Sequence, residues 1–274
     1  MEIFLRCAIA VFAFQCLLFV IALLKKNNGI ADIGWGLGFI IISVIAYFFR
    51  ADTPDPDWTS QDLILFFVLA WGLRLSIYLL IRNWNKPEDW RYAAWRQDWG
   101  RSFFIRSFLQ VFILQGFFMM VIGSPIMLAF LSPYEIQVHQ HILLAEIAMS
   151  MGIIFWLIGF FFQAVGDAQL FRFKKDPANK GRVMRYGVWR YTRHPNYFGE
   201  ATMWWGIFLI SCVSAHGVLD VVLRMIGPAT ITFMLLRVSG VTMLENKYKG
   251  NKEYEDYQTN TSSFIPMLPK IKGQ

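Results

Sequence analysis

Seven long apolar stretches constrain this chain more than any other feature of its sequence. Each has about the length of the roughly 20 helical residues that cross a hydrocarbon core. Most are interrupted only by glycine, serine or a single polar residue. The stretches cover residues 3–24, 30–49, 62–81, 107–131, 142–165, 197–214 and 218–242. The sequence therefore predicts an all-α, polytopic membrane protein with about seven transmembrane helices.

The composition agrees with a membrane protein. Of the 274 residues, 56% are hydrophobic and only 16% are charged, against about 25% charged residues in an average soluble domain. This balance excludes a disordered chain or a small disulfide scaffold. The three cysteines and four histidines show no spacing typical of a metal or redox site, so we expect no metal.

Basic residues are distributed unevenly between the stretches. They crowd residues 82–106, residues 172–193 and the tail after residue 243, and none occurs in 132–141 or 211–217. By the positive-inside rule, the N-terminus is expected outside and the C-terminus in the cytoplasm. Because topology accounts for the net charge of +7, we expect no nucleic-acid partner.

The first apolar stretch is expected to remain in the protein as a helix. No signal-peptidase-like site follows it, and Lys25 and Lys26 come directly after its end. The polar segments are too short to form separate domains. We therefore expect residues 1–274 to form a single membrane domain.

Ionisable and strongly polar groups at membrane depth are functional candidates, because their burial in lipid is costly. For Arg224, which is far from any recognisable motif, pairing or snorkelling is the favoured interpretation. The candidates within or beside the apolar stretches are Asp32, Arg74, Gln163, Asp167, Glu200, Arg224 and Arg237.

Residues 163–200 hold the densest group of polar side chains. Arginine and lysine suit phosphates, asparagine and carboxylates suit sugars and amides, and tyrosine and tryptophan stack on planar rings. This mixture is typical of a site for a nucleotide-like cofactor. His194 and Pro195 mark a turn into a helix whose N-terminal amides can bind an anion. A basic loop that only sets topology or contacts anionic lipid is the alternative.

Several motifs together resemble the DUF1295 group of bacterial membrane proteins. The clearest is the run Arg-His-Pro-Asn-Tyr-Phe-Gly-Glu at 193–200, with Asp-Ala-Gln at 167–169 upstream. Residues 71–78, 28–36 and 264–266 fit the same group. That group is similar to the C-terminal domain of steroid 5α-reductases.

The resemblance implies a seven-helix membrane protein that holds NADPH from the cytoplasmic side. It would reduce an activated carbon–carbon double bond in a small hydrophobic substrate, such as a lipid or steroid. Residues 1–106 would supply the substrate side and 107–274 the reductase-like part with the cofactor site. A bacterial inner membrane is the implied location. The implied cofactor-binding residues are Arg74, Tyr78, Gln163, Asp167, Lys174, Arg182, Arg193, His194, Asn196, Tyr197 and Glu200.

The substrate side departs from the reductase pattern. Where the reductases use a Gln-Glu pair and a Tyr to grip the enone, this chain offers Asp32 and Trp71. An apolar environment favours a protonated carboxyl group, so Asp32 is a candidate proton donor, and helix capping or ion pairing is its equal alternative. The substrate and the oligomeric state stay open.

Two other functions stay open beside the reductase. Arg193-His194-Pro195 followed by Tyr197 also resembles the isoprenylcysteine carboxyl methyltransferases, which bind S-adenosylmethionine. The excess of basic residues between 166 and 195 favours the polyanionic NADPH. A transporter or structural membrane protein is the second alternative. The Gly34-x-Gly36-x-Gly38 run lies in an apolar stretch with no preceding strand, so it predicts close helix packing and not a dinucleotide-binding fold.

Overall fold

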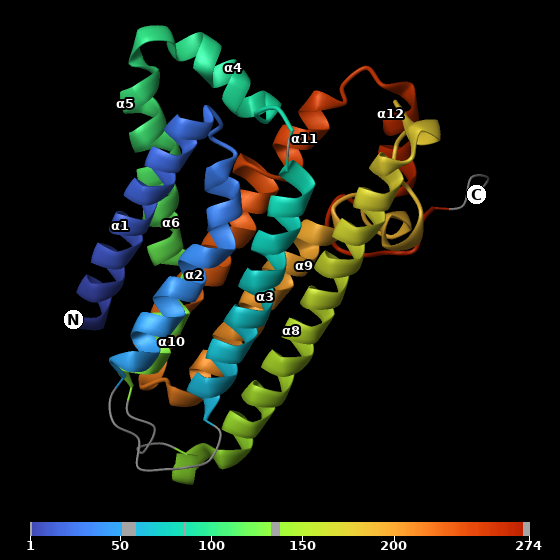
Figure 1. The fold of residues 1–274 in the computed structure, drawn as a ribbon. Coiled ribbons are helices and arrows are strands. Elements are labelled where there is room, and N and C mark those ends of the chain that lie inside the picture. Colours follow the sequence, from blue (N-terminus) through green and yellow to red (C-terminus); the bar gives the residue numbers. More distant parts are fainter. Residues whose placement is uncertain (1, 51–58, 85, 133–137, 271–274) are drawn as a thin grey trace. The chain divides into compact units, whose positions relative to one another are not determined.

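The fold is helical throughout the residues that the structure describes. The structure is a computed structural model, and it describes residues 2–50, 59–84, 86–132 and 138–270 (Figure 1). Helix makes up 82% of the chain. Among the described residues no strand occurs, and one isolated bridge pairs Thr192 with Ser262. The expectation of an all-α protein is confirmed.

Twelve α-helices follow one another along the described residues, joined by short 3₁₀ and π segments. They are α1 (Glu2–Lys25), α2 (Ile30–Phe48), α3 (Ser60–Asn83), α4 (Trp90–Trp99), α5 (Phe103–Ser107), α6 (Leu114–Ile122), α7 (Ser124–Leu131), α8 (Val138–Lys175), α9 (Pro195–Ser211), α10 (Gly217–Phe233), α11 (Val241–Lys247) and α12 (Lys252–Asn260).

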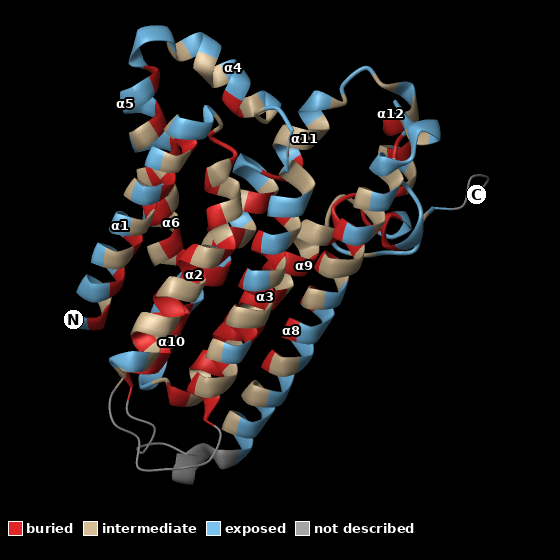
Figure 2. Cartoon of the chain, viewed as in Figure 1, coloured by how far each residue is buried: buried red, intermediate tan, exposed pale blue. Residues whose placement is uncertain are grey.

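Six helical segments are long and apolar enough to cross a membrane: Glu2–Lys25, Ile30–Phe48, Ser60–Asn83, Trp90–Ile122, Leu143–Lys175 and Gly217–Lys247. Large hydrophobic side chains are exposed along them, and Figure 2 shows exposed positions along α1 and α8. Only 28% of the most apolar window of α1 is buried. An apolar exterior of this kind indicates a multi-pass integral membrane protein.

The fourth apolar stretch differs from its predicted single helix over 107–131. The helical path of this span begins already at Trp90, and α6 ends at Ile122. A turn at Gly123 then leads into α7, which has Pro125 in its first turn. Proline has no backbone N–H to donate to the preceding turn. One apolar run therefore contains two helices.

Contacts within the chain define two compact units. Unit 1 consists of residues 1–146 and 210–227, and unit 2 of residues 147–209 and 228–274. In unit 1, α2 packs against both α1 and α3. The predicted substrate-side residues lie in unit 1, and the residues of the densest polar segment lie in unit 2.

The three glycines near the start of α2 permit close helix packing in unit 1. A Cβ atom at Gly36 would lie 2.5 Å from the carbonyl oxygen of Gly72 on α3. Added Cβ atoms at Gly34 and Gly38 would collide with side chains of α1 and α6. The glycine run therefore brings α2 close to three neighbours, which confirms the predicted packing role.

Arg224, in α10, connects this helix with neighbouring segments of unit 1. Its side chain is fully buried, and its guanidinium forms an ion pair with Asp220 at 2.9 Å. It also donates to the hydroxyls of Ser132 at 3.0 Å and Ser214 at 3.1 Å, and to the carbonyl oxygen of Ser211. The pairing expected for Arg224 is therefore observed, because a buried guanidinium must use its donors inside the protein.

Candidate functional site

Glycines form the contact between α8 and α9 in unit 2. On α8 they recur every seventh residue, at Gly152, Gly159 and Gly166. A Cβ atom at Gly159 would lie 2.5 Å from the carbonyl oxygen of Gly199, and one at Gly206 would lie 2.7 Å from that of Gly152. Backbone therefore meets backbone along this contact. Short polar side chains of one helix can consequently reach the other helix.

Two amide–carboxylate pairs join α8 to α9 at the Gly199 end of this contact. Gln163 Nε2 donates to Glu200 Oε2 at 3.1 Å, and Asn196 Nδ2 donates to Asp167 Oδ1 at 3.3 Å. Gln163 and Asp167 are four residues apart, as are Asn196 and Glu200, so each couple shares one face of its helix.

Three of these four polar side chains are buried, and Asn196 is half-buried. The exposed fraction is 2% for Gln163, 4% for Asp167 and 8% for Glu200. Burial of two carboxylates among apolar helices is costly even when both are hydrogen-bonded. We therefore regard the four paired side chains as the centre of the candidate site.

Exposed basic residues follow Asp167 of the candidate site along the chain. The last turn of α8 carries Arg172, Lys174 and Lys175. Lys174 and Arg182 are both exposed to solvent. Because both cationic side chains are exposed to solvent, they can attract a polyanion.

Arg193 binds the C-terminal tail. Its side chain is only 9% exposed, and Nε and Nη2 donate to Glu245 Oε1 at 2.9 and 2.6 Å. Nη1 donates to the carbonyl oxygens of Gln258, at 3.1 Å, and of Thr261. These contacts give Arg193 a structural role beside the cofactor contact that the sequence predicted, and that contact stays a prediction.

His194 directly precedes α9, and Tyr197 lies in the first turn of α9. Their rings are stacked with centroids 5.4 Å apart, and His194 Nε2 lies 3.3 Å from Glu245 Oε1. Burial lowers the pKa of His194 below its ordinary value of 6.5, and this effect outweighs that of the hydrogen bond to Glu245, which raises the pKa. His194 is therefore neutral near pH 7.

The tail is anchored on the segment before α9. The Tyr257 hydroxyl donates to the carbonyl oxygen of Trp189, and Arg193 N donates to that of Ser262 at 2.9 Å. Burial raises the pKa of Tyr257 above its ordinary range, so the hydroxyl stays protonated and remains a donor. The tail thus helps to fix the turn that precedes the candidate site.

Sequence reasoning missed part of this unit. Glu245 was not predicted as a site residue, although it contacts both Arg193 and His194. These contacts join residues about 50 positions apart, so no local motif reveals them. The seven-residue glycine spacing on α8 was the available signal for the close contact with α9.

Four predicted residues lie in unit 1. Trp71 is 3% exposed and packs on Phe39 with centroids 5.6 Å apart. Arg74 and Tyr78 are half-buried and lie one helical turn apart on α3. The structure therefore gives Trp71 a packing contact and places Arg74 and Tyr78 on one face of their helix.

Asp32 forms an ion pair. Its carboxylate accepts from Arg91 Nη2 at 2.9 Å and from the Tyr92 hydroxyl at 2.6 Å. Arg91 Nε also contacts Asp89 at 2.8 Å. The contacts of Asp32 are thus those of an ion pair, and its role as a proton donor stays a prediction.

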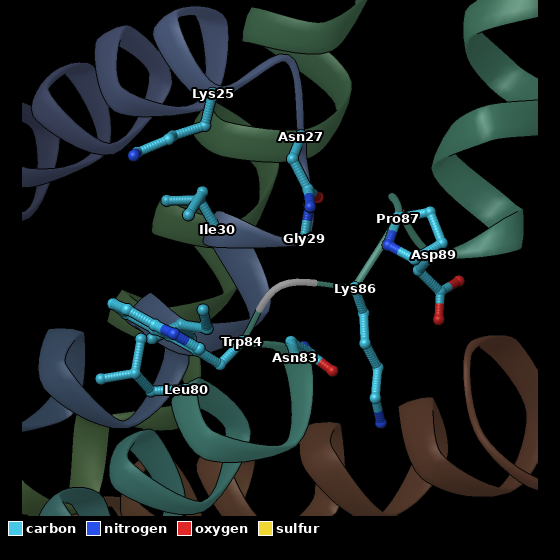
Figure 3. A pocket seen from close by; sticks show the side chains of 11 residues that line it. Lys25, Asn27, Gly29, Ile30, Leu80, Asn83, Trp84, Lys86, Pro87 and Asp89 are labelled. Carbon is cyan, nitrogen blue, oxygen red and sulfur yellow. The ribbon is translucent and has the colours of Figure 1, made fainter.

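Unit 1 also contains a cavity of about 470 Å³, lined by none of the predicted residues. It lies between the turn that joins α1 to α2 and the segment that joins α3 to α4 (Figure 3).

Comparison with known proteins gives one match. The family described as "Protein of unknown function (DUF1295)" matches residues 18–261. No curated protein and no solved structure matches the chain.

Proposed function

We propose, starting from the fact that this chain belongs to the DUF1295 family, that it is a membrane-embedded NADPH-dependent reductase. Its substrate would be a lipid or steroid-like molecule with a polarised carbon–carbon double bond. The observation that carries this proposal is the buried contact Gln163–Glu200 and the part-buried contact Asn196–Asp167, which join α8 to α9.

The four paired side chains fit part of a nucleotide cofactor. Carboxylates accept hydrogen bonds from ribose hydroxyls and from a carboxamide, and side-chain amides both donate and accept. In the proposal Asn196, Glu200 and Asp167 bind the nicotinamide and ribose groups, and Gln163 orients Glu200. When bound, NADPH supplies the hydride that reduces the substrate.

The basic residues fit the phosphate groups. Arg182 and Lys174 are exposed cations on the segment that follows the buried pairs, and charge-assisted hydrogen bonds to phosphate are strong. The resemblance to the reductases also implies Tyr78 and Arg74 as cofactor-binding residues. The turn into α9 is anchored by Arg193, His194 and Tyr197. In the proposal these residues position Asn196 and Glu200.

The membrane context supports a bilayer-derived substrate. We propose seven spans, with the N-terminus outside, the C-terminus in the cytoplasm and the cofactor site facing the cytoplasm of a bacterial inner membrane. In this proposal α9, a helix of 17 residues, spans the membrane in addition to the six long apolar segments. It is about 26 Å long, close to the roughly 30 Å thickness of a hydrocarbon core. A small hydrophobic molecule would then enter from the lipid side.

The substrate side of the proposal gives Asp32 a structural role. Its ion pair with Arg91 holds the start of α2 against α4. The chain's own contribution to catalysis is then orientation of the cofactor and exclusion of water from the reacting carbon atoms. Trp71 is the remaining predicted residue near the substrate.

Thermal stabilisation of the detergent-purified protein tests the proposal. We expect NADPH at about 100 times its Kd to stabilise the fold by about 2.7 kcal/mol. Asn196→Ala should abolish this response, and Asn246→Ala, at an exposed position of α11, should retain it. Stabilisation by S-adenosylmethionine alone would instead identify a methyltransferase. No response to either ligand would favour a transport or structural role.

A further inference from the structure

The cavity in unit 1 has the composition of a site for an anion. It is lined by the end of α1, the start of α2, the end of α3 and the segment that follows α3. Two lysines, Lys25 and Lys86, contribute to its lining from two of these segments (Figure 3). In Figure 3 the two lysine side chains run in different directions from their segments.

The carboxylates near the cavity are already neutralised by arginines. Asp89 lines the cavity and pairs with Arg91 at 2.8 Å. Arg91 also pairs with Asp32, at 2.9 Å. Glu88 accepts two hydrogen bonds of 2.8 Å from Arg96.

The two lysines remain without such a partner. Within residues 2–50, 59–84, 86–132 and 138–270, neither Lys25 nor Lys86 forms an ion pair. The cavity therefore carries an excess of positive charge that an anion would neutralise.

The polar lining consists largely of hydrogen-bond donors. Asn27 Oδ1 accepts from the backbone N of Gly29 at 2.8 Å, and Asn83 Oδ1 accepts from Arg82 Nε at 3.2 Å. Since each amide oxygen is engaged, the side chains of Asn27 and Asn83 present their Nδ2 donors. Together with the lysine ammonium groups they form the donor set that phosphate oxygens require.

Part of the cavity lining is apolar. It is formed by Ile30, Ile33 and Leu80, with Trp84 at the end of α3. Trp84 is 66% exposed. Tryptophan at the end of a membrane-crossing helix marks the level of the lipid head groups. A ligand in this cavity would thus meet both lysine side chains and apolar surface.

Hydrogen bonds hold the two segments that form the cavity in place. Asn28 N donates to Glu88 Oε1 at 2.7 Å, and Arg96 clamps the same carboxylate. Asn28 is additionally tied to Ser107 at 2.8 Å. Because the frame is fixed by these contacts, little backbone order has to be gained on binding.

We propose that this cavity binds the phosphate group of an anionic phospholipid. Lys25 and Lys86 neutralise the phosphate, Asn27 and Asn83 donate hydrogen bonds, and the apolar wall receives the start of an acyl chain. This lipid site is separate from the proposed reduction and does not depend on it.

Lipid binding to the full-length, detergent-solubilised protein tests the proposal, with phosphatidylglycerol and phosphatidylcholine as probes and native mass spectrometry as the readout. We expect phosphatidylglycerol to bind at least tenfold more tightly than phosphatidylcholine. The double variant Lys25→Gln, Lys86→Gln should lose this preference. The matched control Lys249→Gln, Lys270→Gln removes the same charge from two exposed lysines and should keep it.

Two further variants keep the test decisive if the double variant is unstable. Lys25→Arg with Lys86→Arg should retain the preference, because the charge is conserved. Leu80→Trp, at a residue 41% exposed, should weaken phosphatidylglycerol binding by filling the apolar wall without changing any charge.

Three results would overturn the proposal. They are equal binding of the two lipids, unchanged binding by the Lys→Gln double variant, and displacement of phosphatidylglycerol by inorganic phosphate at equal concentration, which would identify a site for free phosphate. All binding is measured without NADPH, so failure of the reductase proposal would leave these outcomes unaffected.

Discussion

Single side chains in unit 2 show how the turn before α9 is held. The Arg193 guanidinium binds one carboxylate and two carbonyl oxygens of the tail. His194, the next residue, contacts the same carboxylate of Glu245 and stacks on Tyr197. Neighbouring residues of one motif therefore connect the tail with the first turn of α9.

Loss of the Arg193 side chain should destabilise unit 2. Arg193→Ala leaves Glu245 without its cation and two tail carbonyl groups without a donor. Removing one partner of a buried ion pair costs about 3–5 kcal/mol, and we expect about 3 kcal/mol because Glu245 retains 21% side-chain exposure. Chemical unfolding in detergent measures it. Arg190→Ala, at an exposed position, is the control. Equal stability of both variants would contradict the tail contact.

The stability of the protein should fall on mild acidification because of His194. Its pKa is lowered in the folded protein, mainly by burial. The unfolded chain therefore binds the proton more readily, and stability is lost as the pH falls below about 6.5. The slope from one such group is at most about 1.4 kcal/mol per pH unit.

Melting temperatures between pH 7.5 and pH 5.5 measure this effect. His194→Gln should flatten the decline, and His216→Gln, a control at an exposed position, should keep the slope of the unaltered protein. An unchanged slope in His194→Gln would assign the acid sensitivity to other groups.

At the level of elements, the sequence predicted the positions of the helices better than the contacts between helices. Five of the apolar stretches coincide with long apolar helices, and a sixth, 107–131, overlaps one. The stretch 107–131 is divided at Gly123 because Pro125 cannot continue the preceding helix. The α8–α9 contact was not predicted, since it depends on glycines of two helices that face each other only after folding.

A side chain at the glycine contact should separate α8 from α9. In Gly159→Ala the new Cβ would lie 2.5 Å from the carbonyl oxygen of Gly199, so the helices must move apart. Overpacking of this kind costs about 1–3 kcal/mol. We also expect the Gln163–Glu200 contact to weaken and NADPH affinity to fall. The control Ser150→Ala, at an exposed position of α8, should change neither property. Unaltered stability of Gly159→Ala would contradict the close approach.

At the level of the whole molecule, composition and apolar patterning predicted a multi-pass helical membrane protein, and the exposed apolar residues agree. Other features depend on distant partners and could not be predicted. Asp32 is ion-paired with Arg91, 59 positions further on. The guanidinium of Arg193 donates its hydrogen bonds to a tail that begins some 50 residues later. A local motif identifies such residues but not the side chains that satisfy them.

The distribution of basic residues also predicts the orientation of the chain. Because cationic residues crowd the segments after α3 and α8 and the tail, the C-terminus is expected in the cytoplasm. A C-terminal green fluorescent protein fusion should fluoresce, and a C-terminal alkaline phosphatase fusion should be inactive. The opposite pattern would reverse the topology and place the basic segment of unit 2 outside.

Direct titration of NADPH tests the central claim that the buried pairs of α8 and α9 form a cofactor site. Cofactor fluorescence is followed with the purified protein, with Glu200→Gln and with the exposed control Asn246→Ala. We expect saturable binding to the unaltered protein and the control, and at least tenfold weaker binding to Glu200→Gln, because a neutral amide replaces the carboxylate. Equal affinity of all three proteins, or no binding to the unaltered protein, would contradict the account.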